Sequence, residues 1–403
     1  MPDTAAAREL FNRSRAPEIA ASVDDRLVRE PCRSDRFAQF GDADTVLLVA
    51  GDQEERAVEL ALAYGVAWAD GRRLLLALPE RFRTATAQRI PWLRSAARPT
   101  LWLHDGRRAV PAPERSREDT VAAVTASLGG STPEDEFRRA ATALHLRERS
   151  DWVTELVDLA TRDDRLDPAH TQSERSWHHR GQRVLSVVRT SGGVRVRAGI
   201  HHSADPERNT WAVDGPLSAA ELGGIREVVD AAIASRSSGD DPAVRRDDEH
   251  LLQAVLRRSP AVVGIEQQAM REVPAWRPTD TTRGWARGYV DLVGLDGNGD
   301  VLVTETKLEK NADPLFLLQG LDYLVWAQAY RSALTGRLGA ADGARIRLAL
   351  VVGARSDGAP HLPAYTRALA AALDDDVPWT ARVVRGWAEP DPRPVGEPLD
   401  LLP

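Results

Sequence analysis

Three short apolar runs, separated by segments with a helical period, dominate the first third of the chain. They are TVLLVAG, RRLLLALP and TLWLHDG, which begin at Thr45, Arg72 and Thr100. Apolar runs of this length that alternate with helical segments are typical of βαβ units, whose parallel strands share one sheet. The pattern predicts a Rossmann-like α/β domain over residues 43–130. Residues 1–42 show no clear period and are expected to form an N-terminal arm.

The first apolar run ends in GDQEE, residues 51–55. This turn lacks the G-x-G-x-x-G pattern and places carboxylates where a pyrophosphate would need bare backbone amides. The sequence therefore argues against an ordinary dinucleotide site. A nucleotide or protein regulator of this domain stays open as an alternative, and a nucleotide would bind at the carboxyl ends of the strands, near Gly51 and Asp105.

A second, smaller module is predicted over residues 131–240. It combines a helical segment that ends near Arg162, a hairpin about the turn at Ser191, Gly192 and Gly193, and an amphipathic helix from Leu217 to Ala234. The polar stretch at residues 235–248 has no apolar period and marks the main domain boundary. A fragment that begins near Ala243 is accordingly expected to fold alone and to retain the chemistry of the C-terminal domain.

Residues 243–403 predict a mixed sheet with helices on its faces. A helix from Glu249 to Arg258 comes first, and Ser259 and Pro260 end it. Strands are expected near 262–274, 287–295, 301–308, 344–353 and 380–386, and helices near 313–334 and 362–373. The order is α-β-β-β-α-β, and the whole chain is expected to be a multidomain α/β protein.

Composition narrows the functional class. Of 403 residues, 42% are hydrophobic and 28% charged, and no apolar run approaches the length of a membrane span, which predicts a soluble, cytoplasmic protein without membrane contact. The single cysteine excludes an internal disulfide. A net charge of -7 argues against indiscriminate nucleic-acid binding, which needs many cationic contacts to phosphates, but it leaves room for a local basic groove.

The segment VTETKLEK contains both lysines of the chain, Lys307 and Lys310. Since lysine and arginine together number 53, the other 51 are arginine. A lysine ammonium is a compact charge whose pKa can be shifted, whereas a guanidinium is a planar fork that stays protonated. The exception in an arginine-rich chain suggests a position that requires an ammonium.

Residues 287–308 read as a β-hairpin whose loop is Asp296 to Asp300, or the three residues between them. Either loop pairs Leu295 with Val301 and sets Asp291 opposite Glu305, with Cβ atoms about 4.5–5.5 Å apart on one face. Lys307 then lies on that face as well. A two-residue turn at Asn298 and Gly299 is also compatible with the sequence, and it would send Glu305 and Lys307 to the other face.

Two opposed carboxylates repel each other unless a cation lies between them. Oxygen ligands of this kind suit Mg²⁺ or Mn²⁺, which commonly take one or two protein carboxylates and fill the remaining positions with water and substrate phosphate. A nearby lysine can orient an attacking water and offset the charge on a phosphate. The combination of Asp291, Glu305 and Lys307 therefore predicts a phosphodiesterase site.

These residues resemble the PD-(D/E)XK nucleases, within them the RecB-like and NucS-like endonuclease domains. The likeness spans roughly residues 243–353, with the family's restriction-endonuclease-like order of elements. It rests on Glu249 in EHLLQAVLRRSP, Asp291 in RGYVDLVG, Glu305 to Lys307 as E-x-K, and Gln319 with Tyr323 as Q-x-x-x-Y. The first 240 residues do not resemble the NucS endonucleases, so the resemblance does not extend to mismatch or branched-DNA specificity.

The resemblance implies a role for each of these positions. Asp291, Glu305 and the Thr306 carbonyl would bind the metal, Lys307 would be the catalytic lysine, and Glu249 would position water or the lysine. Gln319 and Tyr323 would contact the substrate backbone. In-line attack would leave 5′-phosphate and 3′-hydroxyl ends.

The residues expected to line a DNA path are basic and flank the site in sequence. They are Arg257, Arg258, Arg283, Arg287 and Lys310. The overall prediction is a metal-dependent deoxyribonuclease, in DNA repair or anti-phage defence, which the N-terminal region regulates or targets. Two alternatives stay open: a nucleotide-gated effector nuclease acting on DNA or RNA, and a nucleic-acid-binding module without catalysis. A homodimer is also left open.

Overall fold

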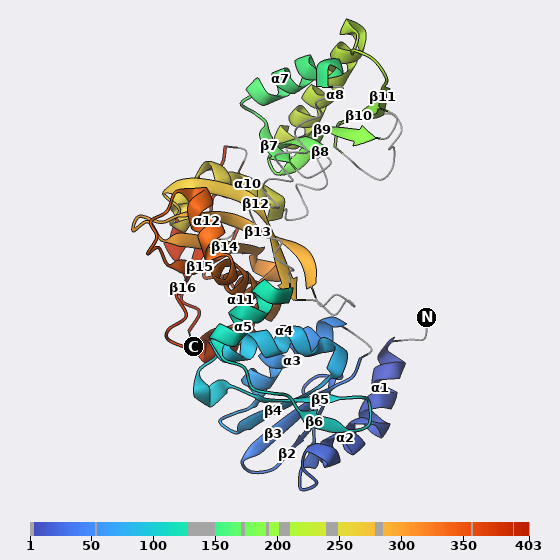
Figure 1. Cartoon of the computed structure of the whole chain (residues 1–403), viewed down its shortest axis with the longest axis vertical. Helices are drawn as coiled ribbons and strands as arrows, with labels where there is room; N and C mark the ends of the chain where they lie inside the picture. The colour runs from blue at the N-terminus through green and yellow to red at the C-terminus, as the bar shows by residue number, and fades with distance from the viewer. Residues whose placement is uncertain are drawn as a thin grey trace.

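The computed structural model describes residues 4–52, 55–127, 150–170, 174–190, 193–200, 210–238, 249–278, 285–355, 358–389 and 391–402. Within these ranges the chain is a mixed α/β protein with three sheets, two of which contain parallel pairs. The six-stranded sheet of the C-terminal residues lies in the middle, between the five-stranded sheet at one end and the N-terminal six-stranded sheet at the other (Figure 1). None of the described helices has the length and apolar character needed to cross a bilayer.

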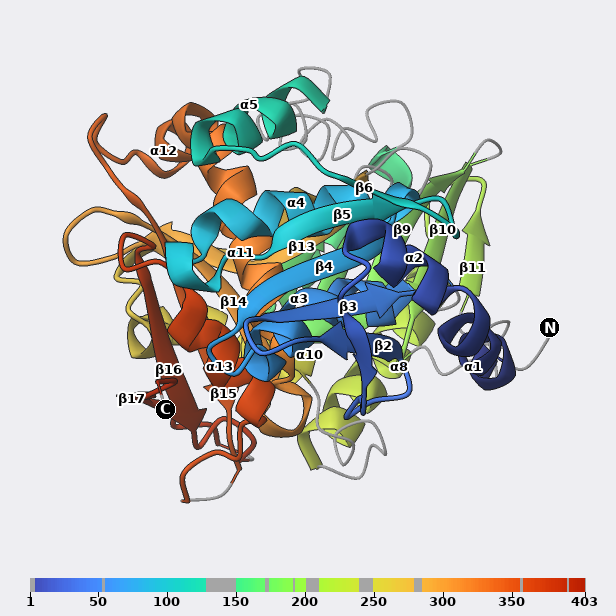
Figure 2. The same ribbon diagram turned by 90° about the horizontal axis from the view of Figure 1, so that it is seen from below.

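The three apolar runs of the N-terminal third are adjacent parallel strands, as predicted. They are β3 (Thr45–Ala50), β4 (Arg73–Pro79) and β5 (Thr100–His104). The helices α3 (Glu55–Trp68) and α4 (Arg83–Arg89) follow β3 and β4 along the chain. Antiparallel strands complete the sheet, which has the order β1-β2-β3-β4-β5-β6, and Figure 2 shows its strands side by side. The added strands are β1 (Val28–Glu30), β2 (Phe37–Gly41) and β6 (Ala109–Pro111).

Residues 4–41 belong to this domain, which differs from the separate arm expected from the sequence. They form α1 (Thr4–Ser14), α2 (Ala16–Val23), β1 and β2, and β2 pairs with β3. Phe11 and Ile19 pack against Leu47 and Val49 of β3 in a core on the face of the sheet opposite α3. These elements are too short, at 3–11 residues, to produce a periodic signal, which is why the sequence did not reveal them.

The middle module is an antiparallel sheet with a core of its own. The strands have the order β11-β10-β9-β8-β7, and the predicted hairpin is present, with Thr190 of β9 paired with Gly193 of β10. The elements are α7 (Thr154–Arg162), β7 (Asp167–His170), β8 (Glu174–His179), β9 (Gln182–Thr190), β10 (Gly193–Ala198), β11 (Thr210–Val213) and α8 (Ala219–Ser238). The predicted helical residues before 150 lie outside the described residues.

The C-terminal sheet has the order β12-β13-β14-β15-β16-β17. Strands β14, β15 and β16 are parallel, and the other neighbours are antiparallel. The strands are β12 (Gln267–Pro278), β13 (Trp285–Leu295), β14 (Val301–Leu308), β15 (Ile346–Gly353), β16 (Trp379–Arg385) and β17 (Val395–Pro398). The helices are α10 (Glu249–Arg258), α11 (Pro314–Ala329), α12 (Arg331–Leu338) and α13 (Ala364–Ala372). The single helix expected over 313–334 is divided at Tyr330.

Different helices cover the two faces of this sheet. Leu302 of β14 packs with Leu252 and Leu256 of α10. Val301 and Val303, which alternate with Leu302, pack on the other face with α11. Because successive strand residues point to opposite faces, the unbroken apolar run at the start of β14 buries one residue after another under α10 and α11 in turn.

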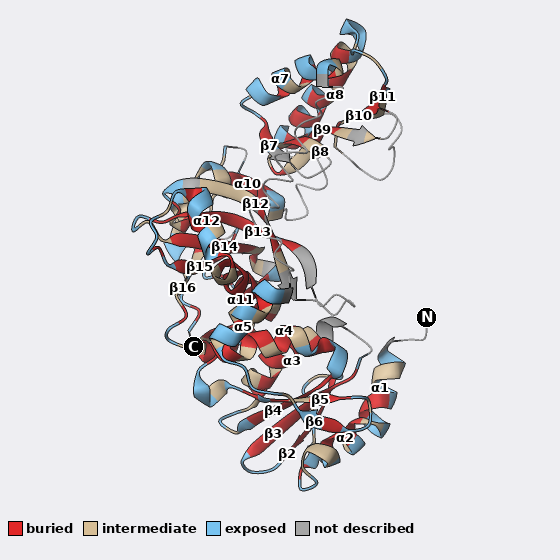
Figure 3. Ribbon diagram, viewed as in Figure 1, coloured by how far each residue is buried: buried red, intermediate tan, exposed pale blue. Residues whose placement is uncertain are grey.

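The N-terminal and C-terminal domains share one continuous apolar core. Helices α3, α4 and α5 (Arg117–Ser127) lie between the two sheets, beside α11 (Figure 1). Figure 3 shows buried residues on both sides of this junction. Tyr64 of α3 packs on Tyr365 of α13 with ring centroids 4.6 Å apart. A fragment that begins near Ala243 would expose this face to water, which argues against the independence expected from the polar boundary.

A buried ion pair crosses the same junction. Arg89 at the end of α4 donates to both carboxylate oxygens of Asp322 in α11, at 2.8 and 2.6 Å. Their side chains are 2% and 1% exposed. The fork of a guanidinium matches a carboxylate in this bidentate geometry. Nothing in the sequence links two residues 233 positions apart, so this contact could not be anticipated.

We predict that Arg89→Met destabilises the full chain by about 3–5 kcal/mol, because it leaves a carboxylate buried without its charge partner. Arg94 pairs with Asp375 across the same junction, but these side chains are 47% and 84% exposed. Arg94→Met should therefore cost about 1 kcal/mol or less. The double variant Arg89→Met/Asp322→Leu should recover most of the loss. Urea unfolding of the three variants tests this, and equal losses for the two single variants would contradict it.

Candidate functional site

The hairpin between β13 and β14 has the register predicted from its sequence. The Asp296 amide donates to the Asp300 carbonyl at 2.9 Å, which closes a three-residue loop. The paired residues run from Leu295 with Val301 to Leu292 with Thr304. Gly299 supplies the positive φ that the loop needs. The alternative two-residue turn is therefore wrong.

The pairing of β13 with β14 stops at Leu292 and Thr304, one position before Asp291 and Glu305. Beyond that point the Asp291 carboxylate takes the place of a strand partner. One of its oxygens accepts from the Thr306 amide and hydroxyl, both at 2.7 Å, and the other accepts from Gln253 of α10 at 2.7 Å. The residues therefore meet where the two strands part, and not on a flat sheet face as expected from strand alternation alone.

Lys307 is bonded to three oxygens of the site. Its ammonium donates to Glu249 of α10 at 2.9 Å, to Glu305 at 3.0 Å and to the Thr306 carbonyl at 3.1 Å. The Glu305 side chain is 4% exposed, whereas Lys307 and Glu249 are 19% and 27% exposed. The residues named by the family resemblance on α10, β13 and β14 are thus gathered at one place, and one side of the group reaches solvent.

Burial sets the protonation behaviour of the group. It raises the pKa of Asp291 to about 6, even though Lys307 and the Thr306 bonds favour the charged form. Burial, then repulsion from Asp291, raises the pKa of Glu305 well above its usual value. Burial acts to lower the pKa of Lys307, but attraction to Glu305, Asp291 and Glu249 outweighs it and raises this pKa. The single positive charge of Lys307, which stays protonated, therefore does not fully balance the negative charge of the carboxylates.

The donor set suits a hard cation that needs few protein ligands. Asp291 lies near enough to Glu305 to raise the pKa of that carboxyl by repulsion, and the Thr306 carbonyl accepts from the same ammonium as Glu305. Mg²⁺ and Mn²⁺ accept such oxygen donors and complete their shells with water. Among the described residues, no group of three or more His, Cys, Asp or Glu side chains is placed to hold a metal ion.

The predicted substrate contacts on α11 have different surroundings. Tyr323 is 5% exposed and packs in the shared core. A Cβ atom on Gly288 of β13 would lie 2.5 Å from the Tyr323 hydroxyl oxygen, so the ring needs glycine there. Gln319 is half-buried one turn earlier. The two residues lie on the helix beside β13 and β14, and their contact with substrate stays a prediction.

Two of the five basic residues predicted to bind nucleic acid have partners within the chain. Arg257 and Arg258 donate to Asp167 of β7, at 3.1 and 3.3 Å. They join α10 to the middle module, so their binding to phosphate stays a prediction that would require shared or exchanged contacts. The side chains of Arg283, Arg287 and Lys310 lie outside the described part of the chain.

Sequence reasoning missed Gln253, which bonds both Asp291 and the Thr306 hydroxyl, the latter at 3.3 Å. Its position gave a usable signal. Gln253 follows Glu249 by four residues, so the two lie on the same face of α10. A polar residue on the face that carries the predicted catalytic glutamate was the available clue.

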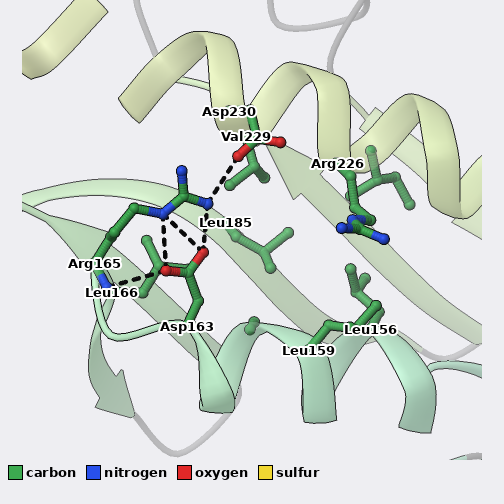
Figure 4. A pocket seen from close by; sticks show the side chains of 11 residues that line it. Leu156, Leu159, Asp163, Arg165, Leu166, Leu185, Arg226, Val229 and Asp230 are labelled. Carbon is green, nitrogen blue, oxygen red and sulfur yellow. Dashed lines mark hydrogen bonds and ion pairs between the residues drawn. The ribbon is translucent and has the colours of Figure 1, made fainter. Parts of the chain in front are cut away.

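Two cavities formed by described residues have other linings. One of about 90 Å³ lies in the middle module between α7, α8 and β9, where Arg165 bonds Asp163 and Asp230 at 2.7 and 2.8 Å (Figure 4). Another, of about 330 Å³, lies along β16 and β17.

No protein-family model, curated protein or solved structure matches this chain. Functional inference therefore rests on the residues around Lys307.

We predict that Glu305→Gln stabilises the protein without added metal, and does so more at high pH. A carboxyl group whose pKa is raised by folding contributes stability at low pH, and that contribution is lost as pH rises through the folded value. The difference in melting temperature, variant minus wild type, should therefore widen between about pH 5 and about pH 8. Thermal unfolding in EDTA measures it. A constant difference across this range would show that folding does not raise the pKa of Glu305.

Proposed function

We propose that the protein is a Mg²⁺- or Mn²⁺-dependent nuclease that acts on DNA through Asp291, Glu305, Lys307 and Glu249. The observation that carries this proposal is the ammonium of Lys307, which donates to two glutamates and to the Thr306 carbonyl. The buried carboxylate of Asp291 lies beside it. A fold gains little stability from burying mutually repelling carboxylates, since their desolvation opposes folding. Such a cluster is better explained by chemistry than by packing.

The named residues have distinct parts in the proposed reaction. A bound divalent ion supplies charge neutralisation for the scissile phosphate and lowers the pKa of an attacking water. Asp291 and Glu305 would provide its carboxylate ligands, and Gln253 and Thr306 fix the Asp291 carboxylate by hydrogen bonds. Lys307, fixed by Glu249, places a positive charge where the phosphate gains negative charge.

The order of elements supports the same class. Helix α10, strands β12, β13 and β14, helix α11 and strand β15 occur in the order α-β-β-β-α-β, with the short helix α12 between α11 and β15. The residues of the resemblance lie on α10, β13, β14 and α11, which are the elements expected for a PD-(D/E)XK nuclease. DNA as substrate, and a restriction-endonuclease-like core, are what that resemblance implies.

The nucleotide-gated alternative gains no support from the topology of the N-terminal domain. Its parallel strands lie in the simple order β3-β4-β5. Because such crossovers are right-handed, both connections pass over the same face and create no switch point between these strands. In open α/β sheets, nucleotides bind at switch points. Regulation or targeting by this region is therefore proposed without a nucleotide ligand.

The central test is cleavage by the purified full chain. Single-stranded, duplex and branched DNA, and RNA, are each incubated with Mg²⁺, Mn²⁺ or EDTA. The proposal expects metal-dependent cleavage of at least one DNA form, with 5′-phosphate and 3′-hydroxyl products. Binding without cleavage under all metal conditions would favour the catalytically silent module, and cleavage confined to RNA would reject DNA as the substrate.

We predict that Lys307→Arg folds normally but loses cleavage by about 10²- to 10⁴-fold, the usual contribution of a positioned catalytic group. A guanidinium keeps the charge, but it is larger and favours bidentate pairing with one carboxylate, so it would compete with the metal at Glu305. The rate is measured at saturating Mg²⁺, with thermal unfolding as the folding control. Near-wild-type cleavage would mean that position 307 does not require an ammonium.

A further inference from the structure

The middle module touches the candidate site through the tip of one hairpin. Arg180 and Gly181 form the two-residue turn between β8 and β9, and both have positive φ, at 48° and 80°. This is what a tight hairpin of the I′ type requires. A Cβ atom on Gly181 would collide with the carbonyl oxygen of His250 and would lie 2.8 Å from the amide nitrogen of Leu251. The turn therefore rests directly on the backbone of the first turn of α10.

The same helix provides two groups of the candidate site. Glu249, next to His250, accepts a hydrogen bond from Lys307, and Gln253 donates to Asp291. A shift of the first turn of α10 would move Glu249 with it. Because the atoms that face Gly181 belong to backbone, they cannot yield by a change of rotamer.

A second contact holds the other end of α10. Asp167 of β7 is 7% exposed and accepts from both Arg257 and Arg258. Arg258 also donates to the Asp164 carbonyl at 3.2 Å. The ends of α10 that meet Gly181 and Asp167 are separated by about seven residues, or about 10 Å of helix. The module thus contacts one helix at two places, and β7 and β8 lie next to α10 in Figure 1.

The turn itself is fixed from within the module and from beyond it. Arg236, buried in α8, donates to the Arg180 carbonyl at 2.8 Å. The Arg180 guanidinium donates to the Glu389 carbonyl of the C-terminal domain at 2.8 Å. A turn that is hydrogen-bonded on both sides can hold the helix it contacts in place, whereas a loop without such bonds cannot.

We propose that the middle module positions α10, and through it Glu249 on Lys307, so that Gly181 and Asp167 are positioning residues of the nuclease. This inference rests on the proposed function. It assigns to residues 150–238 a part in the rate of cleavage, through a direct contact with the helix that carries Glu249.

The test compares Gly181→Ala with Gly71→Ala in the full chain. Gly71 has φ of 78°, and nothing lies within 4 Å of a Cβ placed there, so its alanine variant carries the same backbone strain without the collision. Both variants should melt at lowered temperatures, and Gly181→Ala should melt at the lower one because of its collision with α10. Gly181→Ala alone should lower kcat about tenfold or more, with KM for DNA changed less than about threefold, because misplacing a catalytic group by about 1 Å can cost 10²-fold.

A second pair of variants tests the same role in case Gly181→Ala does not fold. Asp167→Asn removes the charge that pairs with α10, whereas Asp163→Asn removes a pair with Arg165 that stays within the module. Asp167→Asn should lower kcat by about threefold or more, and Asp163→Asn should not. If neither Gly181→Ala nor Asp167→Asn lowers kcat relative to its control, the positioning role is wrong.

Hydrogen exchange of the amides of residues 253–258 gives a readout that does not depend on activity. Their bonds to preceding carbonyls hold α10, so exchange should accelerate in Gly181→Ala and not in Gly71→Ala. Unchanged exchange would overturn the positioning role even if cleavage fell. A wild-type protein that cleaves no nucleic acid while Gly181→Ala accelerates exchange would instead reject the proposed nuclease function and leave the mechanical coupling supported.

Discussion

The arrangement of the C-terminal domain depends on balancing buried negative charge with a single ammonium. Asp291 and Glu305 are almost fully buried, and the only lysine with described contacts lies between Glu305 and Glu249. These groups come from three elements, with Asp291 on β13, Glu305 and Lys307 on β14, and Glu249 on α10, so the three elements must meet at this point. The amide of Thr306 and the side chain of Gln253 complete the bonding of Asp291. The end of the β13–β14 ladder is the position where all of these groups can converge.

Each helix that flanks this point is held by a different part of the chain. The middle module contacts both ends of α10, through Gly181 and Asp167. The N-terminal domain is bonded to α11 through Arg89 and Asp322. Asp322 directly precedes Tyr323 and lies on the helix that carries Gln319. The regions outside the C-terminal sheet therefore contact both helices that carry residues of the candidate site.

Local pattern predicted the parts of the structure that local physics determines. Alternating apolar runs gave β3, β4 and β5 as parallel strands, and the even spacing of Asp291 and Glu305 gave the hairpin register. The pattern failed where a short element gains stability only from distant partners. Strand β2 forms because β3 is beside it, and the contact of Arg89 with Asp322 exists only in the folded chain. Propensity in a window of residues contains no such information.

The candidate site shows the same division. Its charged residues could be named from type and spacing, because metal and phosphate chemistry limit the choices. The direction of the Asp291 side chain could not, since it depends on where the ladder with β14 ends. Nor could the partners of Arg257 and Arg258, because Asp167 reaches them from a separate sheet. Spacing along a chain identifies chemical groups, and tertiary contacts decide which of their neighbours they meet.

The shared core also has a consequence for how the protein is made. Arg89 and Asp322 are 233 positions apart, with the whole middle module between them. At about 5–20 residues per second, a ribosome needs about 12–47 s to travel from one to the other. During that time the apolar face of α3 and α4 has been synthesised and its partner helix has not. The nascent chain must therefore pass through a stage in which this face is open to chaperones or to other chains.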